Sequence, residues 1–301
     1  MSARESLNAA SARRARIVAT LARGKGEELT EEDDAGDDDR SFIQGLAKGL
    51  TVIQTFNGSP LPLSLARIAE RTGLSRAAVR RVLITLERLG FVAHHDERHF
   101  VLTPRVLSLG YAYLTSMPLW AFAEPILESL VQEVRETCTL AMLDDTEAVY
   151  VLRIPLHRIL NQGVTVGSRM PAYCTSYGRV LLSGLTPAQL DAYFERARLT
   201  AFTDHTVTDV EELRGLIGEV RRKGYSWVRG QMQEYVCGLS VPVYDANGRV
   251  LAALNMSANR PDVSEKNFVR ETLPLLKRAA ERMNASLLAG ANQRITRHIQ
   301  R

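Results

Sequence analysis

Four arginines lie within one short stretch of the chain, residues 76–88, which directly follows a Thr-Gly-Leu-Ser turn. Arg76, Arg80 and Arg81 lie towards its start, and Glu87 is its one acidic residue. Surface helices that need only solubility usually mix charges of both signs at spacings of three and four residues. An arginine guanidinium can donate two parallel hydrogen bonds to guanine, and it also pairs with phosphate. The stretch therefore predicts a polyanionic partner, which we expect to be double-stranded DNA.

The segments around these arginines have the order of a winged helix-turn-helix domain. Apolar spacing predicts a helix within 42–56, a short helix between Ser64 and Gly73, and a third helix capped by Ser75. The apolar residues of the third helix form one stripe, so its arginines face away from the core. Two β-prone runs around a polar turn follow at 91–103 and predict a hairpin. Helix, helix, turn, helix and hairpin is the order of this DNA-binding domain.

In such a domain the third helix enters the major groove and the hairpin forms the wing. The residues expected to contact DNA are Ser75, Arg76, Arg80, Arg81, His95 and Arg98. One winged helix covers only about half a turn of groove, so we expect a dimer or a larger assembly. The helices at 42–56 and 105–117 are the candidates for its contacts. For Tyr111 and Tyr113 the alternative is an intrachain core.

Charge and composition agree with a DNA-binding protein. Residues 41–117 contain nine Lys and Arg against four Asp and Glu, whereas residues 1–40 contain ten acidic and seven basic residues. We expect 1–40 to be a disordered acidic tail. The alternative is that its acids compete with DNA for the basic face. The sequence has no membrane-spanning run and no signal-peptide core, so we expect a cytoplasmic location and no membrane association. Its three cysteines are widely spaced, so we expect neither a disulfide framework nor a metal site.

Strands and helices alternate in the second part of the chain. Two runs within 139–154 predict a hairpin, and the Asn-Gly turn at 245–248 predicts another. The fold class is therefore α+β, with an antiparallel sheet in the C-terminal domain. The expected boundaries are 1–40 for the tail, 41–104 for the DNA-binding domain, 105–122 for a linker helix, 123–290 for the C-terminal domain and 291–301 for a second tail.

The stretch 153–182 combines arginines with a polar helix start at 174–178. Backbone N–H groups at a helix N-terminus and nearby arginines suit a small anion such as a carboxylate. A catalytic alternative is a DNA-tethered enzyme that acts on small carboxylates, with Cys174 as nucleophile and His157 as base. No carboxylate or amide is placed to orient that histidine, and no GxSxG pattern occurs. Because isolated cysteines are usually buried apolar residues, we expect a binding domain, without a cofactor, rather than an enzyme.

Three segments of this chain resemble the IclR family of bacterial transcriptional regulators. They are "LARIAERTGLSRAAVRRVLITLERLG" from residue 65, "VGSRMPAYCTSYGRVLL" from residue 166 and "GLSVPVYDANGRVLAALNMSA" from residue 238. The resemblance covers about residues 41–290, and the second segment is most similar to the branch that controls aromatic catabolism through the β-ketoadipate pathway. The resemblance to this family and branch implies a GAF-like effector domain, a dimer or dimer of dimers on operator DNA, and an effector such as protocatechuate, 4-hydroxybenzoate, catechol or muconate.

The resemblance also implies a set of effector-binding positions. Carried over to this chain, they are Arg158, Gln162, Met170, Ser176, Tyr177, Val236, Gly238, Asn255 and Ser257. Arg158 and the helix start at Ser176 would hold a carboxylate, Tyr177 and Met170 would pack on a ring, and the last two positions would bond the far polar group. Taken alone, Met170 and Val236 are also compatible with plain core.

The stretch 227–243 departs from that branch. It has Gln231 and Gln233 where relatives tend to carry acids, and Tyr235 and Gly238 in place of a glycine and a small polar residue. The effector therefore stays open at this stage, as does the choice between activator and repressor.

Overall fold

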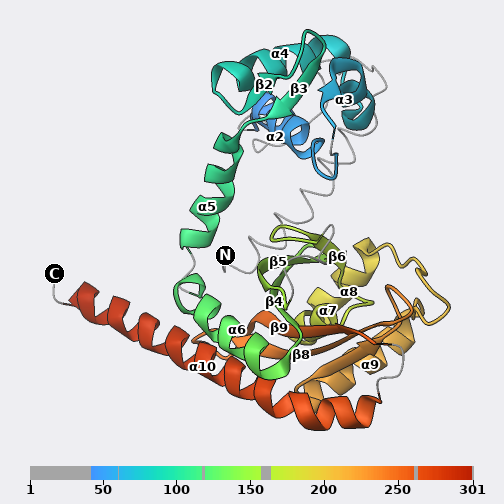
Figure 1. The fold of residues 1–301 in the computed structure, drawn as a ribbon, viewed down its shortest axis with the longest axis vertical. Helices are drawn as coiled ribbons and strands as arrows, with labels where there is room; N and C mark the ends of the chain where they lie inside the picture. The colour runs from blue at the N-terminus through green and yellow to red at the C-terminus, as the bar shows by residue number, and fades with distance from the viewer. Residues whose placement is uncertain (1–41, 60, 117–118, 157–163, 261–263, 300–301) are drawn as a thin grey trace. The chain divides into compact units, whose positions relative to one another are not determined.

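The computed structural model describes residues 42–59, 61–116, 119–156, 164–260 and 264–299. The chain divides into two compact units, one ending at Tyr113 and the other beginning at Leu114. Both are drawn in Figure 1. Each unit has its own hydrophobic core, and each is described by itself.

The first unit is a winged helix-turn-helix domain, as predicted. Its elements are α2 (Gln44–Gln54), β1 (Leu63–Ser64), α3 (Leu65–Thr72), α4 (Arg76–Arg88), β2 (Val92–His94), β3 (His99–Leu102), the 3-10 helix η1 (Pro104–Val106) and α5 (Leu107–Ser116). The strands form an antiparallel sheet in the order β1-β3-β2. The two-residue strand β1 was not predicted, and it pairs Leu63 with Phe100.

Local capping explains where the helices of this unit begin and end. Ser64 Oγ accepts a hydrogen bond from the backbone N–H of Arg67, and Ser75 Oγ accepts one from Ala78, which confirms both predicted caps. Gly73 ends α3 in the left-handed conformation, with a φ of 70°. Helix α2 begins after Ile43 without a side-chain cap.

The core of the first unit is small and apolar. It contains Val52, Leu63, Ile68, Ala69, Val79, Leu83, Leu86, Val92 and Phe100. Three of these residues form the predicted apolar stripe of α4, namely Val79, Leu83 and Leu86. Burying this stripe orients α4, because the arginines between these positions must then face solvent.

The second unit is built on a six-stranded antiparallel sheet in the order β6-β5-β4-β9-β8-β7. Its strands are β4 (Thr137–Asp144), β5 (Glu147–Ile154), β6 (Arg169–Pro171), β7 (Ser226–Arg229), β8 (Val236–Tyr244) and β9 (Val250–Asn259). Its helices are α6 (Trp120–Val134), α7 (Ser176–Ser183), α8 (Pro187–Arg196), α9 (Val210–Lys223) and α10 (Glu265–Ile299). The predicted hairpins β4–β5 and β8–β9 are both present.

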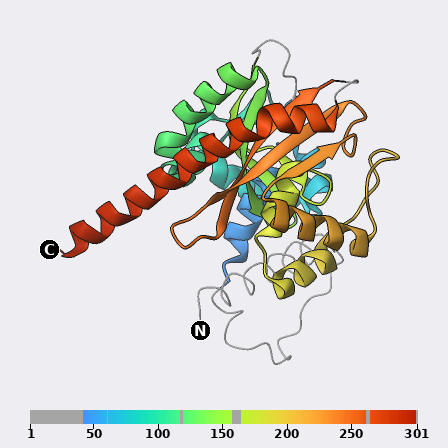
Figure 2. The same cartoon turned by 90° about the horizontal axis from the view of Figure 1, so that it is seen from below.

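Helices cover both faces of this sheet. Helices α6 and α10 pack on one face and on each other, whereas α7 packs on the opposite face and against α9 (Figures 1 and 2). Side chains alternate between the faces along each strand. In β9, Leu254 and Met256 enter the core under α6 and α10, so Asn255 and Ser257 lie on the α7 face. The cavity lined by Asn255 and Ser257 is therefore on that second face.

Two helices run across the expected domain boundaries. Helix α6 already begins at Trp120, within the range expected for the linker, and α10 continues beyond residue 290 to Ile299. Residues 1–40 lie outside the described residues. Within the described ranges, no helix combines the length and apolar character needed to cross a membrane.

Candidate functional sites

Helix α4 and the wing carry a basic surface in the first unit. Arg76, Arg80 and Arg81 are exposed on α4, and Arg98 is exposed on the wing. A hollow of about 530 Å³ lies between α3, α4 and the wing, and Arg76, Arg80 and Arg98 line it. The structure therefore brings three predicted DNA contacts together, while Arg81 is exposed on α4 outside that hollow.

The turn of the wing is organised by one carboxylate. Asp96 Oδ1 accepts hydrogen bonds from the backbone N–H groups of Arg98 and His99, and Asp96 also pairs with the His99 ring. These hydrogen bonds lower the pKa of Asp96, with the Arg98 N–H as the largest cause. His95 is exposed at the same turn. Ser75 acts as the cap of α4, so its hydroxyl already serves the fold.

The second unit holds a cavity of about 620 Å³ between the sheet and the start of α7. Seven predicted effector positions line it, namely Met170, Ser176, Tyr177, Val236, Gly238, Asn255 and Ser257. They come from β6, α7, β8 and β9 and therefore meet only through the tertiary fold. The other two, Arg158 and Gln162, lie outside the described residues, as does His157.

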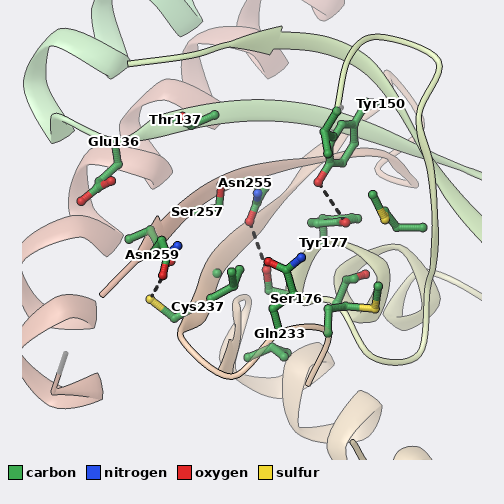
Figure 3. Close-up of a pocket in the computed structure, with 18 of the residues that line it drawn as sticks. Glu136, Thr137, Tyr150, Ser176, Tyr177, Gln233, Cys237, Asn255, Ser257 and Asn259 are labelled. Atoms are coloured by element: carbon green, nitrogen blue, oxygen red, sulfur yellow. Dashed lines mark hydrogen bonds between the residues drawn. The ribbon is translucent and has the colours of Figure 1, made fainter. Parts of the chain in front are cut away.

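One side of the cavity is polar and buried. Asn255 Oδ1 accepts a hydrogen bond from the Ser176 hydroxyl (3.1 Å). The Ser240 hydroxyl, which has one proton, lies within hydrogen-bond distance of both Asn255 Oδ1 (3.0 Å) and Ser176 Oγ (2.9 Å). All three side chains are at most 3% exposed. Figure 3 shows Asn255 with its oxygen towards Ser176 and its nitrogen on the other side.

The other side of the cavity is aromatic. The phenol of Tyr150 donates a hydrogen bond to the Tyr177 hydroxyl, and both rings are buried (Figure 3). Burial raises the pKa of Tyr150, and it raises that of Tyr177 still further. Both phenols are therefore neutral at physiological pH. Met170 and Val164 pack beside them and complete a surface suited to a planar apolar ring.

Two charged residues belong to the lining. Arg153 lies on β5, with its guanidinium 6.0 Å from the centroid of the Tyr150 ring. Glu136 pairs with Arg260 at 2.5 Å, and burial nevertheless raises the pKa of Glu136. Arg153 is the cationic residue of the described lining, so it is the lining residue best suited to receive a carboxylate.

Glycines permit two close approaches beside the cavity. A Cβ atom on Gly178 would lie 2.1 Å from the carbonyl oxygen of Ala172, so this turn of α7 rests directly on the preceding backbone. A Cβ on Gly238 would lie 2.5 Å from Ser176 Oγ and 3.2 Å from Asn255 Oδ1. The polar side of the cavity therefore needs a residue without a side chain at position 238.

Cys174 has the surroundings of a structural cysteine. Its side chain is buried, and its sulfur lies 3.2 Å from the sulfur of Met232. Burial raises its pKa to about 12, so the reactive thiolate is scarce at neutral pH. Among the described residues, no cluster of three or more His, Cys, Asp and Glu side chains is arranged to hold a metal.

Several lining residues were not among the predicted effector positions. They include Glu136, Thr137, Tyr150, Arg153, Val164, Met232, Gln233 and Asn259. Arg153 does belong to the stretch 153–182, whose arginines were expected to suit a carboxylate. Tyr150 and Arg153 follow from the pairing of β5 with β4, and this register is interrupted by a bulge between Leu140 and Ala141. Without this bulge, side chains would alternate between the two faces along β5, and Tyr150 and Arg153, which are three residues apart, would be expected on opposite faces.

Comparison with known proteins identifies the family. The profile of the bacterial transcriptional regulator IclR C-terminal domain matches residues 111–285, and that of the IclR helix-turn-helix domain matches residues 45–96. The chain belongs to the IclR family. This confirms the predicted resemblance and the prediction of a DNA-binding transcriptional regulator.

Individual relatives support the same assignment. The Pca regulon regulatory protein of Pseudomonas putida is 40% identical over 243 residues, covering 80% of this chain and 83% of the relative. The p-hydroxybenzoate hydroxylase transcriptional activator of Acinetobacter baylyi is 34% identical over 80% of this chain and 91% of its own length. A crystal structure of an IclR homologue from Microbacterium hydrocarbonoxydans, complexed with 4-hydroxybenzoate, superposes with a TM-score of 0.71 at 26% identity, covering 81% of this chain and 99% of that one.

The IclR assignment also decides between the two functional hypotheses. These relatives are named as regulators or described as an IclR homologue, and the Cys174 enzyme alternative finds no support among them. The buried, protonated thiol of Cys174 agrees with that outcome.

Proposed function

We propose that this IclR protein is a cytoplasmic regulator that binds operator DNA through α4 and the wing and binds a small aromatic acid, or its ring-cleavage product, in the cavity of the second unit. The supporting observation is that seven predicted positions line one cavity with an aromatic side and a buried polar side. The relatives named for the Pca regulon and for p-hydroxybenzoate hydroxylase, and the homologue complexed with 4-hydroxybenzoate, support the same ligand class.

Within this proposal, each part of the chain has one role. Residues 41–104 form the DNA-binding domain, with Ser75, Arg76, Arg80, Arg81, His95 and Arg98 at the DNA, and 105–122 form the linker. Residues 123–290 form the effector domain, in which Arg153 and the predicted Arg158 receive the carboxylate. The aromatic ring lies against Tyr177 and Met170, which belong to the buried lining of the cavity.

A thermal-shift screen of the full chain tests the effector class. The panel contains 4-hydroxybenzoate, protocatechuate, catechol and muconate, with a short aliphatic acid as the control. A ligand that binds only the folded state at 100 times its dissociation constant stabilises that state by about 2.7 kcal/mol. We expect at least one panel member, and not the aliphatic acid, to raise the unfolding temperature. A response to none of the four would overturn the proposed effector.

We further propose that the protein binds DNA as a dimer or a dimer of dimers. Helix α2 exposes Leu46 (61%) and Leu50 (47%), and α5 exposes Leu107 (74%) and Tyr111 (69%). Apolar surface of this kind usually marks an interface. Replacing both α2 leucines with Asp is expected to lower the mass measured by sedimentation equilibrium, whereas Leu288→Asp on α10 leaves it unchanged. An unchanged mass for the α2 variant would exclude that helix.

A further inference from the structure

A row of polar side chains crosses the sheet beneath the start of α7. Strand pairing aligns Ser226 with Ser240, Ser240 with Asn255, Asn255 with Thr139, and Thr139 with Arg153. Directly paired residues of antiparallel strands project from the same face, about 4.8 Å apart between neighbouring strands. The first four are at most 2% exposed. A buried sheet face that carries polar residues at four successive strands is unusual, because such groups lose their hydration.

Three members of this row contain atoms whose hydrogen-bonding capacity is unused. Within the described part of the chain, the buried side-chain atoms without a partner are Thr139 Oγ1, Tyr193 OH, Ser226 Oγ and Asn255 Nδ2. Leaving such a group unpaired costs about 1–3 kcal/mol. Of the row members with an unpaired atom, Asn255 is the one that lines the cavity. Its amide nitrogen is therefore the group that a bound molecule can satisfy.

The orientation of that amide is set by its neighbours. Ser176 donates to Asn255 Oδ1 from the helix, and the single hydroxyl proton of Ser240, on the adjacent strand, is within reach of both Asn255 Oδ1 and Ser176 Oγ. Gly238 leaves no room for another group, since even a Cβ atom there would collide with Ser176 Oγ. With two hydroxyls beside its oxygen, the amide presents its nitrogen, a donor of two hydrogen bonds, on its other side.

We propose that Ser176 and Ser240 act as a clamp that makes Asn255 a selector for ligands with a hydrogen-bond acceptor at this end of the cavity. The inference rests on the proposed function and adds a specificity rule to it. A hydroxyl or carbonyl oxygen on the ring accepts from Asn255 Nδ2, whereas an amino group, which chiefly donates, cannot satisfy this donor. Ser240 is fully buried and does not line the cavity, so it is a positioning residue rather than a ligand contact.

Two acids of nearly equal shape test the rule. Isothermal titration of the full chain with 4-hydroxybenzoate and with 4-aminobenzoate measures the preference for an oxygen substituent over an amino group. We expect the parent protein to prefer 4-hydroxybenzoate by about tenfold, the effect of one good hydrogen bond. Ser240→Ala removes one of the two hydroxyls that neighbour Asn255 Oδ1, and the preference for 4-hydroxybenzoate is expected to fall to about threefold or less.

Ser226→Ala is the matched control, because Ser226 lies in the same row, is equally buried and takes no part in the clamp. It is expected to retain the tenfold preference. Equal affinities in the parent, or a preference for 4-aminobenzoate, would overturn the clamp while leaving an aromatic-acid effector in place. The clamp would also be overturned if Ser240→Ala left the preference for 4-hydroxybenzoate unchanged. Binding of neither acid, with no response to the wider panel, would overturn the proposed effector and the clamp together.

Discussion

The phenolic oxygens of Tyr150 and Tyr177 lie 3.0 Å apart, and their rings meet edge to face with centroids separated by 5.3 Å. Tyr150 belongs to β5 and Tyr177 to the first turn of α7. This contact joins the aromatic side of the cavity to α7, whose first residue, Ser176, belongs to the polar side. A ligand that displaces either ring would therefore act on the position of α7.

The tyrosine pair is expected to contribute measurably to stability. Tyr150→Phe and Tyr177→Phe each remove one partner of the same hydrogen bond, so each should lower the free energy of unfolding by about 0.5–1.5 kcal/mol. The double variant should cost less than the sum of the two single variants, because the bond can be lost only once. Denaturant titration of the four proteins measures this coupling. Strictly additive losses would show that the two hydroxyls do not interact.

The same pair predicts how stability depends on pH. Burial raises the pKa of Tyr150 above its usual value of 10.0 and raises the pKa of Tyr177 further, with the neighbouring phenol as a second cause. In the unfolded chain both phenols lose their protons near pH 10, whereas the folded chain retains them. The free energy of unfolding contributed by the pair is thus fully present below pH 10 and falls as the pH rises towards the folded pKa values. Urea titrations below and above pH 10 should show a smaller decline for Tyr150→Phe than for the parent.

Two glycines in helices predict opposite effects of the same substitution. Gly178→Ala would place a Cβ atom 2.1 Å from a backbone oxygen, and we expect a loss of about 3 kcal/mol or more in the free energy of unfolding. Gly215→Ala on α9 meets nothing within 4 Å, so it should stabilise the protein by about 0.5–1 kcal/mol through helix propensity. Thermal unfolding of both variants measures the contrast. A neutral Gly178→Ala would mean that α7 is free to move away from Ala172.

Cys174 is expected to be unreactive and dispensable for regulation. Because its pKa is raised to about 12 by burial, a thiol-specific reagent should modify it slowly in the folded protein and quickly in denaturant. Cys174→Ala should retain DNA affinity and effector affinity within about twofold, since loss of a buried thiol changes packing rather than charge. Absorbance assays with a disulfide reagent and titrations of the variant check both points. Rapid modification of Cys174 in the folded state would contradict the buried geometry.

Arg80 and Arg81 are each expected to support operator binding, and two measurements distinguish a base contact from a phosphate contact. Operator sequences can be selected from a random DNA library with the full chain and then bound at several salt concentrations. If an arginine bonds guanine, its change to Ala should cost about 1–3 kcal/mol and relax one position of the site. If it contacts phosphate, the salt slope should fall by about 0.9. Arg222→Ala on α9 is the matched control, an exposed arginine of the second unit. Unchanged binding by both α4 variants would exclude α4 as the reading helix.

The sequence by itself determined the elements whose signals are local. Ser64 and Ser75 cap helices through backbone groups only three residues away, and the Asn-Gly turn after Asp245 closes its hairpin within four residues. The apolar stripe of α4 likewise needs only the helical repeat, which is why the exposed arginines could be predicted. Strands β1, β6 and β7 were not predicted, because segments of two to four residues are too short to show a periodicity by themselves. The equally short β2 and β3 were predicted from the polar turn between them.

Only the tertiary structure decided which side chains meet. Ser176 and Asn255 are separated by 79 residues, and Cys174 and Met232 by 58, so their contacts depend on strand register and on the packing of α7 over the sheet. The family resemblance placed Asn255 in the pocket, but the orientation of its amide depends on Ser176 and Ser240. The predicted hairpin pairs Ser240 with Asn255 only because its register shifts between Val243 and Tyr244, which the turn sequence does not reveal. Local signals therefore predicted the helices and the hairpin of the DNA-binding unit, whereas the chemistry of the effector pocket depends on contacts between residues far apart in the sequence.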